Sequence, residues 1–159
     1  MNVLIRAAIP EDYGAVCVLY AQVAHVHSQA LPHFFRPVEG PALPLEFFAN
    51  ILANEDAAIF VAEWQATLIG MIHCIVGTTP AVPVVMPRRF VNIDDLVVSE
   101  HVRHQGVGQT LVERVHQWAR EKGVTEVELN VWEFNTPARS LYEKLGYQTT
   151  RRIMRKPLL

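Results

Sequence analysis

Residues 103–110 read RHQGVGQT, and they determine how the chain around them can fold. They lie between an apolar stretch, VNIDDLVV at 91–98, and a stretch of helical period, LVERVHQWAREKG at 111–123. The pattern predicts a strand, a tight turn with two glycines, and a helix. The first amides of a helix lack intrahelical acceptors and lie at its positive end, so they can bind an anion. The glycines indicate either such an anion site or a turn that only needs their backbone freedom.

Two familiar phosphate-binding loops fit this stretch poorly. A Walker loop requires a lysine after its last glycine, and no lysine follows Gly106 or Gly108. A dinucleotide-binding turn requires a third glycine, where this chain has Leu111. That turn also follows the first strand of its unit, whereas this one comes late in the chain. A nucleotide-binding protein that uses either loop is therefore disfavoured.

Hydrophobic periodicity and turn residues predict an α/β protein with an α+β mixed sheet. Three successive strands favour antiparallel pairing, and a later strand–helix–strand unit favours a parallel pair with a right-handed crossover. The expected strands are residues 3–8, 57–63, 68–76, 90–98, 126–132 and 147–154. The expected helices begin at Pro10 and cover 45–54, 109–122 and 137–145, with a hairpin turn at 64–67 and a loop at 77–88. We expect helices on both faces of the sheet.

Composition indicates a single globular domain but does not identify its function. A chain of 159 residues suits one domain, residues 1–159, whose core needs no disulfide or structural metal. A net charge of −2 gives no general attraction for nucleic acid, and no apolar run approaches the roughly 20 residues of a membrane span. Cys17 and Cys74 fit buried, reduced thiols. We expect no nucleic-acid or membrane partner and, without a visible signal peptide, a cytoplasmic location.

A second motif, NTPARSLYEKLGY at 135–147, accompanies the glycine turn. Alone it indicates a short helix in which Tyr142 could be an ordinary core aromatic. Together the two motifs resemble the GCN5-related N-acetyltransferase (GNAT) superfamily. Arg103-x-x-Gly106-x-Gly108 is similar to its R/Q-x-x-G-x-G/A acetyl-CoA signature, and 135–147 is similar to its N-x-x-A-x-x-L-Y-x-x-x-G-F/Y segment. The order of elements and the opening IRAAIPEDYGAV are also similar to that family.

The resemblance implies a GNAT-type fold and transfer of an acetyl group from acetyl-CoA, as co-substrate, to a primary amine. The pyrophosphate of coenzyme A would lie on the amides of the glycine turn, and Arg103 would anchor the turn or lie near phosphate. The pantetheine arm would run beside the preceding strand like an added strand. The residues implied for the donor are Leu96, Val98, Arg103, His104, Gln105, Gly106, Val107, Gly108, Gln109, Thr110, Asn135 and Tyr142.

Acyl transfer needs a base and a proton donor, because an alkyl amine with a pKa near 10.4 arrives protonated and a thiolate departs. By resemblance, the Val98 amide would stabilise charge on the thioester oxygen, and Tyr142 would protonate the thiolate. Asp94 is the first candidate for the base, directly or through water, and His73 is a weaker one. Because strand residues alternate, we expect Asp94 and Asp95 to face opposite sides, although both could be structural.

The acceptor region of this family corresponds to HVHSQALPHFFRP at 25–37 and GTTPAVPVVMPRR at 77–89. The first stretch supplies an aromatic and weakly basic wall. His25 and His27 do not share a helix face, so no metal site is expected. The candidate acceptor residues are His27, His33, Phe34, His73 and Trp132, of which Trp132 either lines a cleft or fills the core. These residues do not identify the amine.

Two functions remain open. The first is an N-acetyltransferase acting on a small molecule or a protein, and the second is a non-catalytic acyl-CoA-binding sensor or interaction module. Asn135 and Tyr142 beside the glycine turn favour the enzyme, because a module that only binds does not need a tyrosine acid. A homodimer is also possible, since QTTRRIMRK at 148–156 corresponds to a strand through which many relatives pair.

Overall fold

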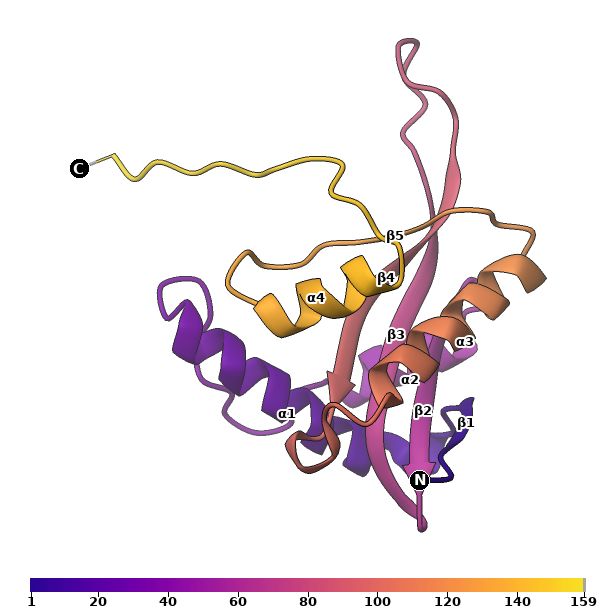
Figure 1. Ribbon diagram of the computed structural model, residues 1–159, viewed down its shortest axis with the longest axis vertical. Helices are drawn as coiled ribbons and strands as arrows, with labels where there is room; N and C mark the ends of the chain where they lie inside the picture. The colour runs from indigo at the N-terminus through magenta and orange to yellow at the C-terminus, as the bar shows by residue number, and fades with distance from the viewer. Residues whose placement is uncertain (159) are drawn as a thin grey trace.

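Figure 1 shows the computed structural model, which describes residues 1–158. Its strands form one sheet in the order β1-β2-β3-β4-β5. Neighbouring strands pair antiparallel except β4 and β5, which are parallel. The strands are β1 (Leu4–Ala7), β2 (Ala57–Trp64), β3 (Thr67–Thr78), β4 (Arg89–Val98) and β5 (Val127–Leu129). The mixed α/β sheet predicted from the sequence is confirmed.

Helices cover the two faces of this sheet, so that an apolar cluster forms on each side (Figure 1). The helices are α1 (Tyr13–Ala30), α2 (Leu45–Ala53), α3 (Val107–Glu121) and α4 (Thr136–Lys144). α1 and α2 pack on one face, and α3 and α4 pack on the other. Neighbouring strand residues contribute to opposite clusters: Val61 packs on the α1 side and Ala62 on the α3 side. This is the alternation that a strand buried on both faces requires.

The hairpin between β2 and β3 has the position expected from the sequence. Its two turn residues, Gln65 and Ala66, have positive φ angles of 51° and 60°, which match the twist of the flanking strands. The loop expected at 77–88 is shorter than predicted, because β3 continues to Thr78 and β4 begins at Arg89. The segment between these strands forms the projection at the top of Figure 1.

Three predictions about the second half of the chain need correction. α3 begins at Val107 rather than at 109, because Gly106 adopts a left-handed conformation and caps the helix there. β5 covers Val127–Leu129 rather than 126–132. The strand predicted at 147–154 is wrong: residues 147–158 contain no strand and leave the sheet as an extended tail (Figure 1).

The tail stays outside the sheet, and its apolar side chains have no buried face. β5, the last strand of the sheet, is three residues long and pairs with β4. The apolar side chains of Ile153 and Met154 are 86% and 91% exposed. Alternation of apolar and polar residues therefore predicted a strand whose apolar side chains are exposed in the described chain.

A salt-bridge network ties β1 to β2 and to the start of α1. Arg6 donates to both carboxylate oxygens of Asp12, at 2.7 and 2.9 Å, and to Glu63 at 2.9 Å. The backbone amide of Ile9 also donates to Asp12, at 2.9 Å. The hydrogen bonds from Arg6 hold the pKa of the Asp12 carboxyl below its usual range, although its burial acts in the opposite direction. The network therefore stabilises the fold only while Asp12 is ionised.

Replacing Asp12 by asparagine should lower the free energy of unfolding by about 2 kcal/mol near neutral pH, because charge-assisted hydrogen bonds are lost. Since the folded-state pKa of Asp12 lies below its unfolded value of about 3.9, this contribution is present above about pH 4 and is lost as the pH falls through the folded pKa. Urea denaturation of both proteins across this range measures it. A difference that stays constant into strong acid would contradict the assignment.

Candidate functional site

The glycine turn connects the end of β4 to the start of α3. After β4, the chain forms a short 3-10 turn (Glu100–Val102) and then contains two left-handed residues, His104 (φ 63°) and Gly106 (φ 84°). By helical geometry the amides of residues 107–109 have no intrahelical acceptor, whereas the Thr110 amide donates to the Gly106 carbonyl at 3.0 Å. These free amides lie at the positive end of a 15-residue helix. The arrangement can bind an anion.

Two polar side chains of the turn support its backbone. Arg103 Nε donates to the Val98 carbonyl at 3.3 Å, so Arg103 anchors the turn to the end of β4. The Thr110 hydroxyl donates to the Gly106 carbonyl at 3.1 Å. His104 and Gln105 are exposed between these two anchors. The turn is therefore held in place from both of its ends.

The two glycines serve different structural purposes. A Cβ at Gly106 would meet nothing within 4 Å, but the φ angle of 84° is strained for any other residue. At Gly108 a Cβ would lie 3.2 Å from the Leu141 side chain on α4. Gly106 thus shapes the turn, and Gly108 permits close packing of α3 against α4.

β4 loses its neighbour on one side at the start of the candidate site. Its parallel pairing with β5 covers residues 91–93 and stops there, whereas its pairing with β3 continues to Val98. Ser99 N–H donates to a carbonyl of β3 at 2.8 Å, so the alternation of the strand directs the amides of Val98 and Leu96 away from β3. This edge of β4 can pair with an added, strand-like ligand.

Tyr142 lies in α4 and Asn135 caps the start of that helix, on the α3 side of the sheet. The Asn135 side-chain oxygen accepts from the Ala138 amide at 3.3 Å and caps the helix. Tyr142 is buried, and its ring centre lies 5.4 Å from that of Tyr147. Burial raises the pKa of Tyr142 above its ordinary value, and the charges of Tyr147 and Asp95 act in the same direction. The phenol is therefore protonated at neutral pH and is able to donate.

A β-bulge in β4 changes the expected positions of the two aspartates. His73 lies opposite Asp95, and the next pair is Cys74 with Ile93, so Asp94 is the extra residue. Both carboxylates thereby approach one atom, His73 Nδ1, with Asp94 Oδ2 at 3.6 Å and Asp95 Oδ2 at 3.8 Å. The prediction that Asp94 and Asp95 face opposite sides is wrong, because strict alternation fails at a bulge.

His73 has an unused hydrogen-bonding atom at the centre of this group. The side chain is 4% exposed, and Nδ1 has no hydrogen-bond partner among residues 1–158. The Tyr20 hydroxyl donates to Asp95 at 2.6 Å, and the Asn92 side chain donates to Asp94. Burial, followed by the charge of Asp95, raises the pKa of Tyr20. Tyr20 therefore serves Asp95 as a hydrogen-bond donor.

Sequence inspection did not place Tyr20 in the site. Its spacing on α1 fits the apolar face of that helix, and Tyr20 also packs with the apolar cluster on the α1 side. The bulge at Asp94 has no signal in the sequence. The register between β3 and β4 brings Asp94 and Asp95 to His73, and the packing of α1 adds Tyr20.

The candidate acceptor residues separate into two groups. His73 lies with the aspartates, and the Phe47 ring meets it edge to face at 6.2 Å. The others belong to what we term the aromatic cluster, which joins the end of α1 and the loop after it to the segment between β5 and α4. Its members are His27, His33, Phe34, Phe35, Trp132 and Phe134. Trp132 is 39% exposed, so it lines a surface and does not fill the core.

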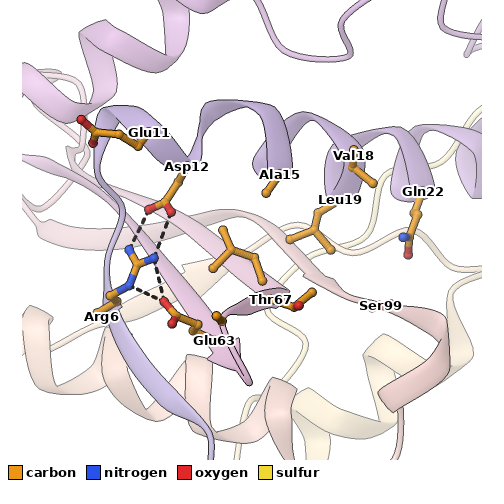
Figure 2. A pocket seen from close by; sticks show the side chains of 12 residues that line it. Arg6, Glu11, Asp12, Ala15, Val18, Leu19, Gln22, Glu63, Thr67 and Ser99 are labelled. Atoms are coloured by element: carbon orange, nitrogen blue, oxygen red, sulfur yellow. Dashed lines mark hydrogen bonds and ion pairs between the residues drawn. The ribbon is translucent and has the colours of Figure 1, made fainter.

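A cavity of about 510 Å³ lies apart from these groups, beside α1, β1 and the β2–β3 turn (Figure 2). Arg6, Asp12 and Glu63 form one end of its wall. Gln22 lies at the other end, and its side-chain carbonyl oxygen has no partner among the described residues. None of the candidate site residues lines this cavity.

Comparison with known proteins identifies the family of this chain. The acetyltransferase (GNAT) family matches residues 20–147. The chain therefore belongs to the GNAT family of acetyltransferases. Within residues 1–158, no helix combines the length and apolar content that a membrane span requires. In the same residues, no three His, Cys, Asp or Glu side chains are grouped so that they could bind a metal ion.

Individual relatives support the same assignment. The uncharacterized N-acetyltransferase YhfO of Bacillus subtilis is 28% identical over 144 residues, which is 91% of this chain and 89% of YhfO. Human N-acetyltransferase 8 is 29% identical over 101 residues, which is 64% of this chain but 43% of that protein. The crystal structure of a mutant BH1408 protein from Bacillus halodurans is 29% identical, with a TM-score of 0.93 over 98% of this chain and 99% of that one.

Replacing Gly106 by alanine should weaken the binding of coenzyme A about fivefold, because the left-handed residue must strain or reorient the turn. Gly123→Ala is a matched control at the other end of α3, since Gly123 also has a positive φ (68°) and free space around its Cβ. Both variants should lose about 1 kcal/mol of unfolding free energy. Calorimetric titration should find weaker binding only in Gly106→Ala, and equal affinities in the two variants would contradict an anion site at this turn.

Proposed function

We propose that this protein transfers an acetyl group from acetyl-CoA to the primary amine of a small molecule or a protein, by direct attack of the amine on the thioester. The observation that carries the proposal is the unpaired edge of β4, which leads into the free amides at the start of α3. A strand-like arm with amide groups could pair with the edge of β4, and a pyrophosphate could bind the free amides of α3. Membership of the family supports the same chemistry.

The donor would be held mainly by the backbone. In this proposal the amides of residues 104–109 bind the pyrophosphate, and Leu96 and Val98 pair with the pantetheine arm. Asn135 would meet that arm from α4 through its side-chain NH2 group, since its side-chain oxygen already caps the helix. Backbone amides suit this task because they are already fixed by β4 and α3 before the donor arrives.

The reaction forms a bond between the amine nitrogen and the thioester carbon and breaks the carbon–sulfur bond. The Val98 amide would stabilise the charge that develops on the thioester oxygen. The departing thiolate takes a proton, and Tyr142 would donate it. The Tyr142 phenol carries its proton when the thiolate forms, although the burial that raises its pKa also makes it a weaker acid.

Asp94 is the proposed base, acting directly or through water. Asp95 is less available, because its Oδ2 already accepts a hydrogen bond from the Tyr20 hydroxyl at 2.6 Å. The unused Nδ1 of His73, 3.6 Å from Asp94, would bind the same water. An ammonium group that arrives here would also be attracted by both carboxylates.

The proposal also covers the domain extent, the cellular location and the association of the protein. Residues 1–159 would act as one acyltransferase domain in the cytoplasm, and two copies would associate through the C-terminal tail. Support for the homodimer comes from the exposed Ile153 and Met154 and from the position of β5 as the last strand of the sheet. Pairing of a tail with a neighbour's β5 would satisfy backbone groups on both.

Replacing Tyr142 by phenylalanine should lower kcat about 10²-fold, because the thiolate then leaves without a proton donor. The affinity for acetyl-CoA should change less than about twofold, since the ring and its packing against Tyr147 remain. Thiol release with a panel of amines measures the rate, and calorimetry measures the affinity. An unchanged rate would remove Tyr142 from the mechanism, and no thiol release from the parent with any amine would favour a module that only binds.

Replacing Asp94 by asparagine should lower kcat/KM most at low pH, where little free amine exists and a base contributes most. Asp95→Asn is the matched control, because it removes the neighbouring carboxylate without changing side-chain size. In this variant the ratio to the parent should vary less with pH. A ratio for Asp94→Asn that is constant with pH would assign Asp94 a structural role.

A further inference from the structure

The aromatic cluster joins parts of the chain that are far apart in sequence. The Phe34 and Phe35 ring centres lie 5.4 and 5.5 Å from that of Trp132. His27 lies 5.1 Å from Phe35 and 5.7 Å from Phe134. These spacings fall within the range of favourable tilted and edge-to-face pairs. The end of α1 and the segment before α4 are therefore linked by ring contacts.

The rings of the cluster are not fully buried by these contacts. Phe34 is 50% exposed, Trp132 is 39% exposed and Phe134 is 36% exposed. Grouped apolar rings at a surface typically mark a binding site, whereas single exposed apolar residues do not. The exposed parts of these rings could therefore contact a ligand.

α1 connects this cluster to the carboxylates. Tyr20, which donates to Asp95, and His27 are separated by seven positions, so they lie on the same face of the helix about 10 Å apart along its axis. A hydrogen bond between His27 Nδ1 and the Val23 carbonyl, at 2.8 Å, fixes the imidazole ring at the far end. A molecule whose nitrogen lies at Asp94 could extend along this face to the aromatic cluster.

The charges around the cluster favour an apolar ring over a second cation. The Arg155 guanidinium already lies over the Phe34 ring, at 4.5 Å. Glu133, the carboxylate within the same segment, is paired with Arg139 at 3.0 Å. A cationic group would be repelled here, whereas an aromatic group would gain ring contacts without that cost.

We propose that the acceptor is a primary amine that carries an aromatic ring at the end of a spacer, and that the aromatic cluster binds this ring. The inference rests on the proposed function and specifies its substrate class. The amine lies between the carboxylates of β4, and the ring lies against Phe34 and Trp132. The spacing between the two groups selects the substrate.

The test compares kcat/KM by thiol release for phenyl-substituted alkylamines of increasing spacer length. Each is paired with the unsubstituted alkylamine of the same spacer, and agmatine supplies a guanidinium in place of the ring. The phenyl compound should be preferred about tenfold at the best spacer length and less at shorter ones. In Trp132→Leu and Phe34→Leu, which keep an apolar side chain, this preference should fall towards one.

Leu4→Ala is the control, since Leu4 is 58% exposed on β1, at the opposite edge of the sheet from β5, and this variant should keep the full preference. Turnover of phenyl and alkyl amines at equal rates would overturn the inference and leave the proposed acetyl transfer standing. A preference for agmatine would overturn the choice of an aromatic ring over a cation. Absence of thiol release with every amine would overturn both the inference and the proposed function.

Discussion

β4 departs from regular pairing on both of its sides at the same place, and the candidate site depends on this. Pairing with β5 ends at Ile93, and the bulge opposite His73 inserts Asp94 one residue later. The first change leaves a backbone edge that can pair with a ligand, and the second brings two carboxylates to one imidazole. The glycine turn follows β4 in the chain. The unpaired edge of β4, its two aspartates and the N-terminus of α3 therefore all lie along this one strand and its end.

The two faces of the sheet contribute to this site in different ways. The α3 and α4 side supplies the free amides of the turn, the cap at Asn135 and the buried phenol of Tyr142. The α1 side supplies Tyr20, which holds Asp95, and it continues towards the aromatic cluster. In the proposed reaction the donor approaches β4 from the first side and the amine from the second. Separate elements can then change acceptor preference without disturbing the donor site.

Much of the fold was predictable, because glycines, prolines and apolar spacing are local signals. The strand–turn–helix unit at Gly106, the β2–β3 turn and the helix that contains Tyr142 all lie within a few residues of their predicted positions. The failures are non-local. A bulge depends on the register between two strands, so alternation placed Asp94 and Asp95 on opposite sides, wrongly. The final strand failed because alternation along the chain does not ensure pairing with the sheet, and Tyr20 was missed because its bond to Asp95 spans 75 positions.

The central claim is that the donor pairs with the edge of β4 and rests on the amides that begin α3. Backbone amide hydrogen exchange, followed residue by residue with and without acetyl-CoA, tests it most directly. The account predicts added protection at Leu96, Val98 and residues 107–109, and none at Gln65 and Ala66 in the β2–β3 turn. Protection confined to residues around the cavity of Arg6 and Gln22, with none on β4, would contradict it.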